Sequence, residues 1–592
     1  MSGADMTSGL YPEPRSLRVE EAAAAGEQVT VIDDSSLPTQ GYSIRADADG
    51  VVVRHTGAAG HRYAASTLRQ LRAVYGGRLP RCEVVDWPDL PVRGFLLDVS
   101  RGRVPTRETL ARLVGLLELG RYNHLQLHVE HAFAYAHHST VWRGSSPLTG
   151  ADLVWLDDTC SAAGIELAAN QSSFGHFGRW LAHETYRSRA ECPSGWEPVP
   201  GHPAPPTVLA PRPENADFVL SLLHEQLGFL SSDTVNIGCD ETFELGWGRS
   251  RDRVVANGVG SVFVEHVNRI ARPLLQQGRR VLAWGDMLAK HPEALPLLDK
   301  AVTSLVWSYE APGATPPELS PRQAKLAQAL GFEGGAPPDF ASLVEPHVDA
   351  GRDFWVCPGT STWNSFVGRG ENARANLLDA AVAGRDSGAS GYLVTDWGDN
   401  GHLQPPSASF APLLYGAAVA WCARTNSDLD VAPVLDREVF ADVAERLGGS
   451  VELLASAAAA TGIPALNASP LFSRVLPKAL SFVASEVDAR GAAAALEALD
   501  AGLAALTAAR PQCADGDLVV AELQTAARLA RVGALRLLGA AGAPRSVDEQ
   551  DLQGLLDDVR SCWLARSRPG EMDESLRPLR EGLDAGAEGP AG

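Results

Sequence analysis

The hydrophobic and polar positions of the first 90 residues follow the two-residue period of strands and then the period of a helix. β-type runs lie at 29–32, 42–44 and 51–53, and apolar positions at helical spacing follow over 63–75. This pattern predicts a small α/β domain over residues 28–90, preceded by a flexible N-terminus at 1–27. Pro88 and Pro91 favour extended backbone, so we expect the domain to end there.

From residue 91 to 427, strand-like runs alternate with helical patterns. The eight runs lie at 94–100, 124–130, 166–170, 234–238, 280–284, 302–307, 354–358 and 391–396. Strand–helix alternation repeated in this way predicts an α/β fold, namely a (β/α)₈ TIM barrel. A doubly wound open sheet is the alternative.

Residues 428–567 show only helical patterns. These lie at 437–447, 451–460, 475–487, 492–508, 517–538 and 548–564, and many are rich in alanine. They predict an all-helical domain that packs either on the barrel or on a second copy of the chain, as in a homodimer. Residues 568–592 are rich in Glu, Gly and Pro, which predicts a disordered tail.

The composition limits the classes of partner and the cellular compartment that we expect. Lys and Arg number 51 against 72 Asp and Glu, a net charge of −21, which argues against nucleic acid and anionic membranes as partners. The N-terminus lacks a secretory signal pattern, and no apolar stretch appears long enough to span a bilayer. The eight cysteines contain no CxxC pair, which favours reduced thiols over disulfides or zinc. We therefore expect a cytoplasmic protein.

One strand carries the most unusual chemistry. The run from Val235 to Ile237 is typical of a short buried strand, and two adjacent carboxylates, Asp240 and Glu241, follow it. Buried acids are costly unless they are paired, hydrogen-bonded or used in chemistry. A salt bridge or a helix cap is the structural alternative to a catalytic role.

The other predicted strand ends supply further polar and aromatic side chains. In TIM barrels these ends form the active site. In chain order they bring Arg101, Glu130, His176, Trp284, Trp307, Trp397 and Asp399. Indole faces stack on sugar rings, while charged groups bind hydroxyls, so the set indicates a carbohydrate pocket. The histidines and acids lack HExxH or a comparable spacing, and no Gly-rich phosphate loop occurs, so we expect neither a metal nor an organic cofactor.

Together these residues resemble glycoside hydrolase family 20, the β-N-acetylhexosaminidases, over about residues 28–423. The resemblance rests on Gly41-Tyr42-Ser43-Ile44, on Tyr63 to Leu71, on Arg93 to Arg101 and on Val235 to Glu241. It implies that Glu241 is the general acid/base and that Asp240 orients and polarises the substrate's 2-acetamido group.

The resemblance also implies roles for the remaining set. Arg101 would bind the hydroxyls at C3 and C4, and Asp399 those at C4 and C6. The three tryptophans would wall the pocket, and Glu130 and His176 would support the catalytic pair. The chain departs from better-known members after strand two, where Glu130 to Phe133 replaces two aspartates and a Gly-Trp. The tyrosine that binds the acetamide oxygen has no clear counterpart, and Tyr309, Thr362 and Trp363 stay open as substitutes.

The chemistry of two consecutive carboxyls agrees with this resemblance. A conventional retaining glycosidase needs carboxyls about 5 Å apart on opposite sides of the scissile bond, which neighbours in sequence can hardly supply. Substrate-assisted hydrolysis avoids the problem, because the acetamide oxygen is the nucleophile. We therefore expect an exo-acting, retaining enzyme that removes terminal β-linked GlcNAc or GalNAc from a glycan or glycoconjugate. A glycosidase of another sugar, or a non-catalytic sugar-binding protein, is the alternative.

Overall fold

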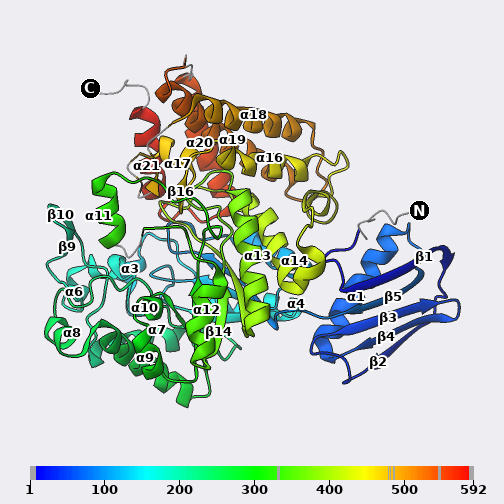
Figure 1. The fold of residues 1–592 in the computed structure, drawn as a ribbon, viewed down its shortest axis with the longest axis horizontal. Coiled ribbons are helices and arrows are strands. Elements are labelled where there is room, and N and C mark those ends of the chain that lie inside the picture. Colours follow the sequence, from blue (N-terminus) through cyan, green and yellow to red (C-terminus); the bar gives the residue numbers. More distant parts are fainter. Residues whose placement is uncertain are drawn as a thin grey trace.

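The computed structural model describes residues 9–329, 334–477, 479, 482–484, 487–543 and 549–585. A small α/β domain, a barrel and a helical domain follow one another along the chain (Figure 1). Residues 1–8 of the predicted flexible N-terminus, and residues 586–592 of the predicted tail, lie outside the described residues.

The small domain is a five-stranded sheet with one long helix. The sheet has the order β1-β5-β3-β4-β2, formed by β1 (Ser16–Ala24), β2 (Val29–Asp33), β3 (Tyr42–Asp47), β4 (Gly50–His55) and β5 (Pro80–Asp86), with α1 (Gly57–Val74) packed against it. The prediction of a flexible N-terminus is wrong for β1, which pairs antiparallel with β5. Leu17 and Val19 alternate with charged residues and pack against the domain core, a strand period that the sequence reading missed.

The predicted TIM barrel is confirmed. Parallel strands close into a barrel in the order β11-β12-β13-β14-β15-β6-β7-β8. They are β6 (Val92–Asp98), β7 (His124–His128), β8 (Glu166–Asn170), β11 (Thr234–Asn236), β12 (Arg280–Trp284), β13 (Val302–Trp307), β14 (Phe354–Cys357) and β15 (Gly391–Asp396). Each predicted run overlaps one of them; β6 alone begins before its run, by two residues. Pairing of β15 with β6 closes the ring, which rules out the open sheet.

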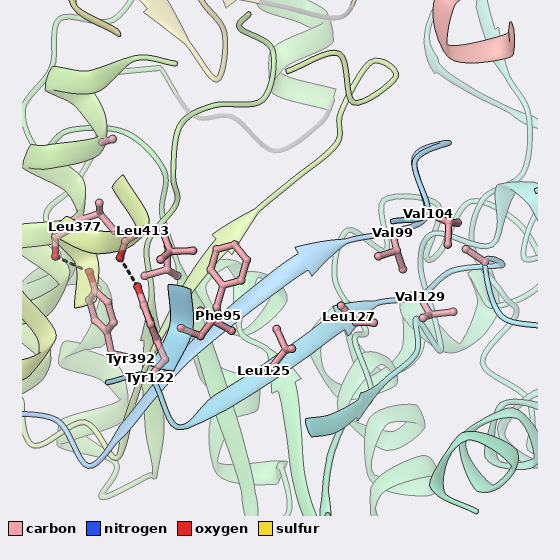
Figure 2. Close-up of a cluster of buried hydrophobic side chains, with 14 of the residues drawn as sticks. Phe95, Val99, Val104, Tyr122, Leu125, Leu127, Val129, Leu377, Tyr392 and Leu413 are labelled. Atoms are coloured by element: carbon pink, nitrogen blue, oxygen red, sulfur yellow. Dashed lines mark hydrogen bonds between the residues drawn. The ribbon is translucent and has the colours of Figure 1, made fainter. Parts of the chain in front are cut away.

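Apolar side chains fill the layer between the strands and the surrounding helices (Figure 2). The helices include α2 (Arg107–Leu119), α4 (Gly150–Ala163), α7 (Pro213–Leu227), α9 (Val259–Gln276), α12 (Phe340–Asp349), α13 (Gly370–Ser387) and α14 (Phe410–Asn426). Two buried tyrosines donate their hydroxyls to helix carbonyls, Tyr122 to Leu413 at 2.8 Å and Tyr392 to Leu377 at 3.0 Å. These bonds remove the cost of burying the hydroxyl groups.

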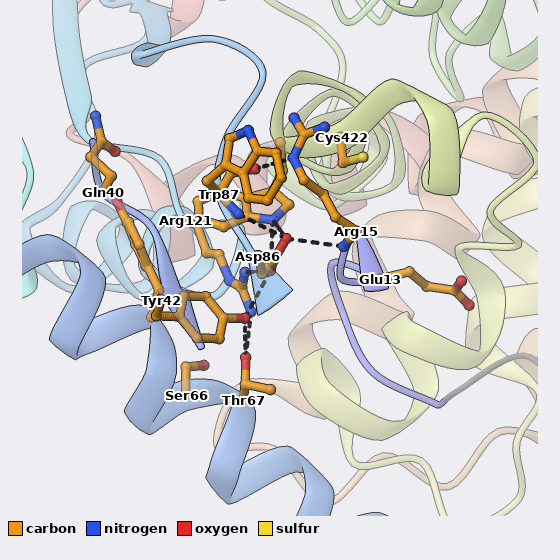
Figure 3. Close-up of polar contacts among 12 residues, drawn as sticks. Glu13, Arg15, Gln40, Tyr42, Ser66, Thr67, Asp86, Trp87, Arg121 and Cys422 are labelled. Carbon is orange, nitrogen blue, oxygen red and sulfur yellow. Dashed lines mark hydrogen bonds and ion pairs between the residues drawn. The ribbon is translucent and has the colours of Figure 1, made fainter. Parts of the chain in front are cut away.

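One buried carboxylate joins the small domain to the barrel. Asp86, at the end of β5, accepts hydrogen bonds from Tyr42, from Arg121 after α2 and from Trp421 of α14 (Figure 3). The arginine and the carboxylate are both almost completely buried. Because each satisfies the other's charge, the pair fixes the two domains against each other.

The C-terminal region is mainly helical and packs on the barrel. Its long helices are α16 (Leu447–Ala460), α18 (Ala489–Ala508), α19 (Gly516–Ala540), α20 (Glu549–Arg566) and α21 (Met572–Ala585). The predicted disordered tail is wrong for α21, which buries Leu576, Leu579 and Leu583. A tail composition that is polar on average hides this apolar stripe at helical spacing.

Two helical expectations in this region are wrong. Residues 437–447 hold the end of a short π-helix (Leu435–Phe440), a left-handed residue at Ala441 and irregular backbone before α16. Over 475–487, α17 (Pro470–Val475) ends ahead of Pro477, and β17 (Phe482–Val483) pairs with β16 (Ala465–Leu466). Proline disfavours helical backbone in the residue before it, which explains the stop.

Among the described helices, α18 alone is long and apolar enough to cross a membrane by length and composition. The expectation that no stretch reaches this length is therefore wrong. Its alanine-rich face contacts α16 and α19 and buries Ala492, Ala495 and Leu499. In all, 28% of its apolar window is buried inside the structure.

Candidate active site

The carboxyl end of β11 is a tight, unusual turn. Gly238, Cys239 and Glu241 all have positive φ values, of 65°, 75° and 50°. A Cβ atom on Gly175, in the loop after β8, would lie 2.2 Å from the carbonyl oxygen of Asp240. Backbone conformations of this kind are costly and persist where the surroundings hold them. The turn therefore presents the two carboxyls in fixed, different directions.

Asp240 is a buried carboxylate with one occupied and one free oxygen. Its Oδ2 lies 3.1 Å from His176 Nε2, while Oδ1 has no hydrogen-bond partner among the described residues. Burial alone would raise the pKa of Asp240, but the charge and hydrogen bond of His176 outweigh it and lower the pKa below its ordinary value. Asp240 is therefore ionised, and its Oδ1 can accept a further hydrogen bond.

Glu241 has the opposite electrostatic setting. Its side chain is 36% exposed and lies 3.4 Å from His176 Nε2. Burial raises the pKa of Glu241, and the negative charges of Asp240 and Asp399 add to the effect. Adjacent carboxyls with pKa values pushed in opposite directions are suited to one ionised and one protonated role.

His176 is the cation between the acids. Its Nδ1 lies 3.5 Å from Glu130 Oε1, on the side opposite Asp240. Burial would lower the pKa of His176, but the surrounding carboxylates raise it to about 10. Arg101 and the cationic histidine together hold the pKa of Glu130 well below its ordinary value despite burial. The structure thus brings Glu130 and His176 next to the Asp-Glu pair, as the sequence predicts.

Arg101 lies beside the pair, in the loop after β6. Its guanidinium contacts Asp98 at 2.9 Å and Glu130 at 3.1 Å, and it stacks 5.3 Å from the ring centre of Trp397. Asp399 follows the neighbouring strand β15, and Arg101 counteracts the rise that burial causes in the pKa of Asp399. A fixed arginine and a carboxylate at one side of the pocket are suited to bind sugar hydroxyls.

The aromatic groups form one cluster. The rings of Trp284 and Trp397 lie 5.9 Å apart, and Trp307 stacks on Tyr309 at 4.9 Å. Tyr309 also contacts Trp363 edge-on at 5.1 Å. Trp284 is only 1% exposed, so it presents less surface to a ligand than the partly exposed Trp307. The structure therefore adds Tyr309 to the predicted tryptophan wall.

Sequence reasoning gave no role to two acids near the site. Asp286, directly after β12, accepts a hydrogen bond from the Glu241 backbone at 3.1 Å, and burial raises its pKa to about 7. Its position after a barrel strand was the available signal. Glu571 lies 2.9 Å from His131, and its segment was predicted to be disordered. No sequence pattern linked residue 571 to the barrel.

The described residues include no group of three or more His, Cys, Asp or Glu arranged to hold a metal ion. The histidines near the site instead contact carboxylates, as His176 does with Asp240 and Glu130. The described site is a network of acids, cations and aromatic rings, and groups of this kind are suited to proton transfer and charge stabilisation.

Comparisons with known proteins bear on the small domain and on the fold. Residues 7–87 match the family model described as glycosyl hydrolase family 20, domain 2. No curated protein matches the chain. The predicted resemblance to glycoside hydrolase family 20 is confirmed by this domain and by solved structures that share the fold.

Three solved structures show the likeness. A β-N-acetylhexosaminidase is 17% identical, with a TM-score of 0.54 over 73% of this chain and 96% of that chain. A chitobiase of Flavobacterium johnsoniae is 13% identical, with a TM-score of 0.51 over 94% and 98%. The β-N-acetylhexosaminidase of Streptomyces coelicolor A3(2) is 16% identical, with a TM-score of 0.51 over 76% and 97%. At these identities the likeness establishes the fold.

Proposed function

We propose that the protein is a β-N-acetylhexosaminidase that removes terminal β-linked GlcNAc or GalNAc from glycans by substrate-assisted hydrolysis. The observation that carries this proposal is the pair Asp240 and Glu241. The two carboxyls are consecutive, their pKa values are shifted in opposite directions, and an aromatic cluster with Trp284 and Trp397 lies at the ends of other barrel strands. The family 20 fold supports the same assignment.

In the first step, the acetamide oxygen of the substrate attacks C1 of the sugar. Glu241, protonated because of its raised pKa, gives its proton to the leaving oxygen as the C1–oxygen bond breaks. The free Oδ1 of Asp240 accepts the acetamide N–H and stabilises the positive charge of the oxazolinium ring. In the second step, Glu241 takes a proton from water, which attacks C1 and restores the acetamide. Two inversions at C1 give net retention.

Tyr309 is our choice for the group that binds the acetamide oxygen. Its hydroxyl is a donor, because burial holds the pKa of the phenol well above its ordinary value, and its ring lies 6.5 Å from Trp397 in the aromatic cluster. Tyr309 interacts with Trp397 and Thr395 at the end of β15, whereas the alternatives donate to other side chains. Thr362 donates to Asp396 at 2.8 Å, and the Trp363 indole donates to Asn467 at 2.6 Å.

Arg101 and Asp399 bind the hydroxyls of the non-reducing sugar in this proposal. They lie after the adjacent strands β6 and β15, whereas Asp240 and Glu241 follow β11. A sugar that spans this pocket has its C1 at the acids and its far hydroxyls at the arginine. This orientation supports action at chain ends.

The test is release of nitrophenol from the β-GlcNAc, β-GalNAc and β-glucose nitrophenyl glycosides, with Glu241→Gln and Asp240→Asn beside the unaltered protein. We expect turnover of the acetamido sugars alone, with kcat lowered about 100-fold or more in each variant. Equal turnover of the glucoside would favour a glycosidase of another sugar. Calorimetric binding of GlcNAc without turnover would favour a sugar-binding protein.

A further inference from the structure

The C-terminal domain pairs with the loop after β6 that carries Arg101. Backbone hydrogen bonds join Thr106 N–H to Arg566 O at 2.9 Å and Arg568 N–H to Val104 O at 2.8 Å. The two segments thus pair as short antiparallel strands, with a bridge between Pro105 and Ser567. Chain segments more than 450 residues apart therefore form one structure beside the sugar pocket.

Arg103 ties three segments together. Its guanidinium donates to Ser567 Oγ at 3.1 Å, to His402 O at 3.3 Å and to Gln404 O at 2.7 Å. The side chain is only 4% exposed, and it also stacks on Trp563 at 4.8 Å. One buried cation therefore links the loop after β6, the loop after β15 and the C-terminal domain.

Ser575, in the first turn of α21, lies against the same two loops. A Cβ atom on Gly102 would be 2.2 Å from Ser575 Oγ, and one on Gly401 would be 3.0 Å from Ser575 O. Both glycines have positive φ, of 87° and 100°. Gly102 directly follows Arg101, and Gly401 lies two residues after Asp399. The close approach requires glycine at both positions.

A third contact of the C-terminal segment lies next to Glu130, the carboxylate paired with Arg101. Glu571, just before α21, lies 2.9 Å from His131 Nε2 and 3.5 Å from Arg179. His131 follows Glu130, which is paired with Arg101. The C-terminal segment therefore contacts each loop that holds the predicted hydroxyl-binding groups.

We propose that the C-terminal helical domain is a positioning part of the sugar site. Arg103 and Ser575 hold the loops after β6 and β15 at the spacing that lets Arg101 and Asp399 bind one sugar's hydroxyls together. The inference rests on the proposed function, because it assigns a purpose to the hydroxyl-binding side of that site. Recognition by charged groups requires positions held within about 0.5 Å, which loops reach only when packed from outside.

Arg103→Lys is the main test variant, since lysine keeps the charge but loses the fork that reaches all three acceptors. Gly102→Ala is the second, because its Cβ displaces Ser575. We measure kcat/KM for the nitrophenyl β-GlcNAc glycoside and for its 4-deoxy and 6-deoxy analogues. We expect the preference for the parent sugar to fall about tenfold in both variants, as when a hydrogen bond to a charged group is lost. In the double variant Gly102→Ala/Ser575→Gly, part of the preference for the parent sugar should be restored, because the added Cβ no longer meets the serine hydroxyl.

The matched control is Arg568→Lys. Arg568 joins the same domain to the barrel through Asp152 at 2.9 Å and Pro147 O at 2.6 Å, and the loop of Asp399 takes no part in either contact. We expect the Arg568→Lys variant to keep the full preference for the parent sugar. Folded Arg103→Lys and Gly102→Ala variants that keep the full preference would overturn the inference.

A second readout separates this inference from the proposed function. Hydrogen exchange in peptides spanning 99–106 and 397–404 should be faster in Arg103→Lys than in Arg568→Lys, whatever the substrate. Equal exchange in both variants would contradict the positioning role. If the unaltered protein releases no acetamido sugar but the two variants still differ in hydrogen exchange, the proposed function is refuted. The positioning role of the C-terminal domain would then stand on its own.

Discussion

At the scale of single residues, His176 sets the charges of the catalytic pair. It lies within 3.5 Å of carboxylate oxygens of Asp240, Glu241 and Glu130, and its pKa of about 10 makes it a cation at neutral pH. It lowers the pKa of Asp240 beyond what burial would allow. The division of labour between neighbouring acids therefore depends on one histidine.

Replacing His176 with Gln should move the pH profile of kcat/KM to higher pH. The acid limb follows ionisation of Asp240, whose pKa rises when the cation that lowers it is lost. The alkaline limb follows Glu241, whose pKa His176 also lowers, so it should move the same way. These limbs report the coupled pair as a whole.

The control for this prediction is His224→Gln, on the exposed face of α7, where the histidine ring is hydrogen-bonded to Gln277 at 3.2 Å. Its pH profile should match that of the unaltered protein. A His176→Gln profile that is unshifted, or shifted to lower pH, would show that His176 does not set these charges.

At the scale of elements, the loops after the barrel strands set the position of the acids. The loop after β8 touches the turn after β11 at Gly175, where the Asp240 carbonyl leaves no room for a side chain. The loop after β12 supplies Asp286, which accepts the Glu241 N–H. Three adjoining strand ends thus define one turn.

Gly175→Ala should therefore reduce kcat without unfolding the protein. The new methyl group pushes the Asp240 backbone, and a shift of about 1 Å can cost about 100-fold in rate. Overpacking of this kind typically costs about 1–3 kcal/mol of stability, which thermal unfolding would report. Gly178→Ala is the matched control three residues further on, at the start of α5 (Gly178–Leu181), since its Cβ meets Thr207 at an ordinary 3.5 Å. Equal kcat values in the two variants would contradict the argument.

At the scale of the whole molecule, the sequence predicts the barrel well and its surroundings poorly. Most barrel strands hold several apolar residues and are followed by a helical pattern, so local periodicity suffices to find them. The strand ends then supplied Asp240, Glu241 and Arg101 together. What brings His176 onto both acids is a loop with φ of 60° at that residue, which periodicity does not encode.

β1 and α21 were not predicted from the sequence, and both were missed for one reason. β1 is paired with β5 about 60 residues later, and α21 packs on α17 and α20 next to Glu571, which contacts His131 440 residues earlier. Their stability comes from tertiary contacts, which override a polar composition. Asp86 likewise acquires its role only when Arg121 and Trp421 surround it. Long-range contacts of this kind join the three domains around the site.

The central claim is that the substrate's acetamide oxygen is the nucleophile, with Asp240 bound to its N–H. The most direct test is kcat for aryl β-glycosides of GlcNAc whose acetyl group carries zero, one, two or three fluorines. Fluorine withdraws electrons from the acetamide oxygen and weakens it as a nucleophile, so kcat should fall steeply along the series. A rate that stays constant across the four substrates would contradict the account.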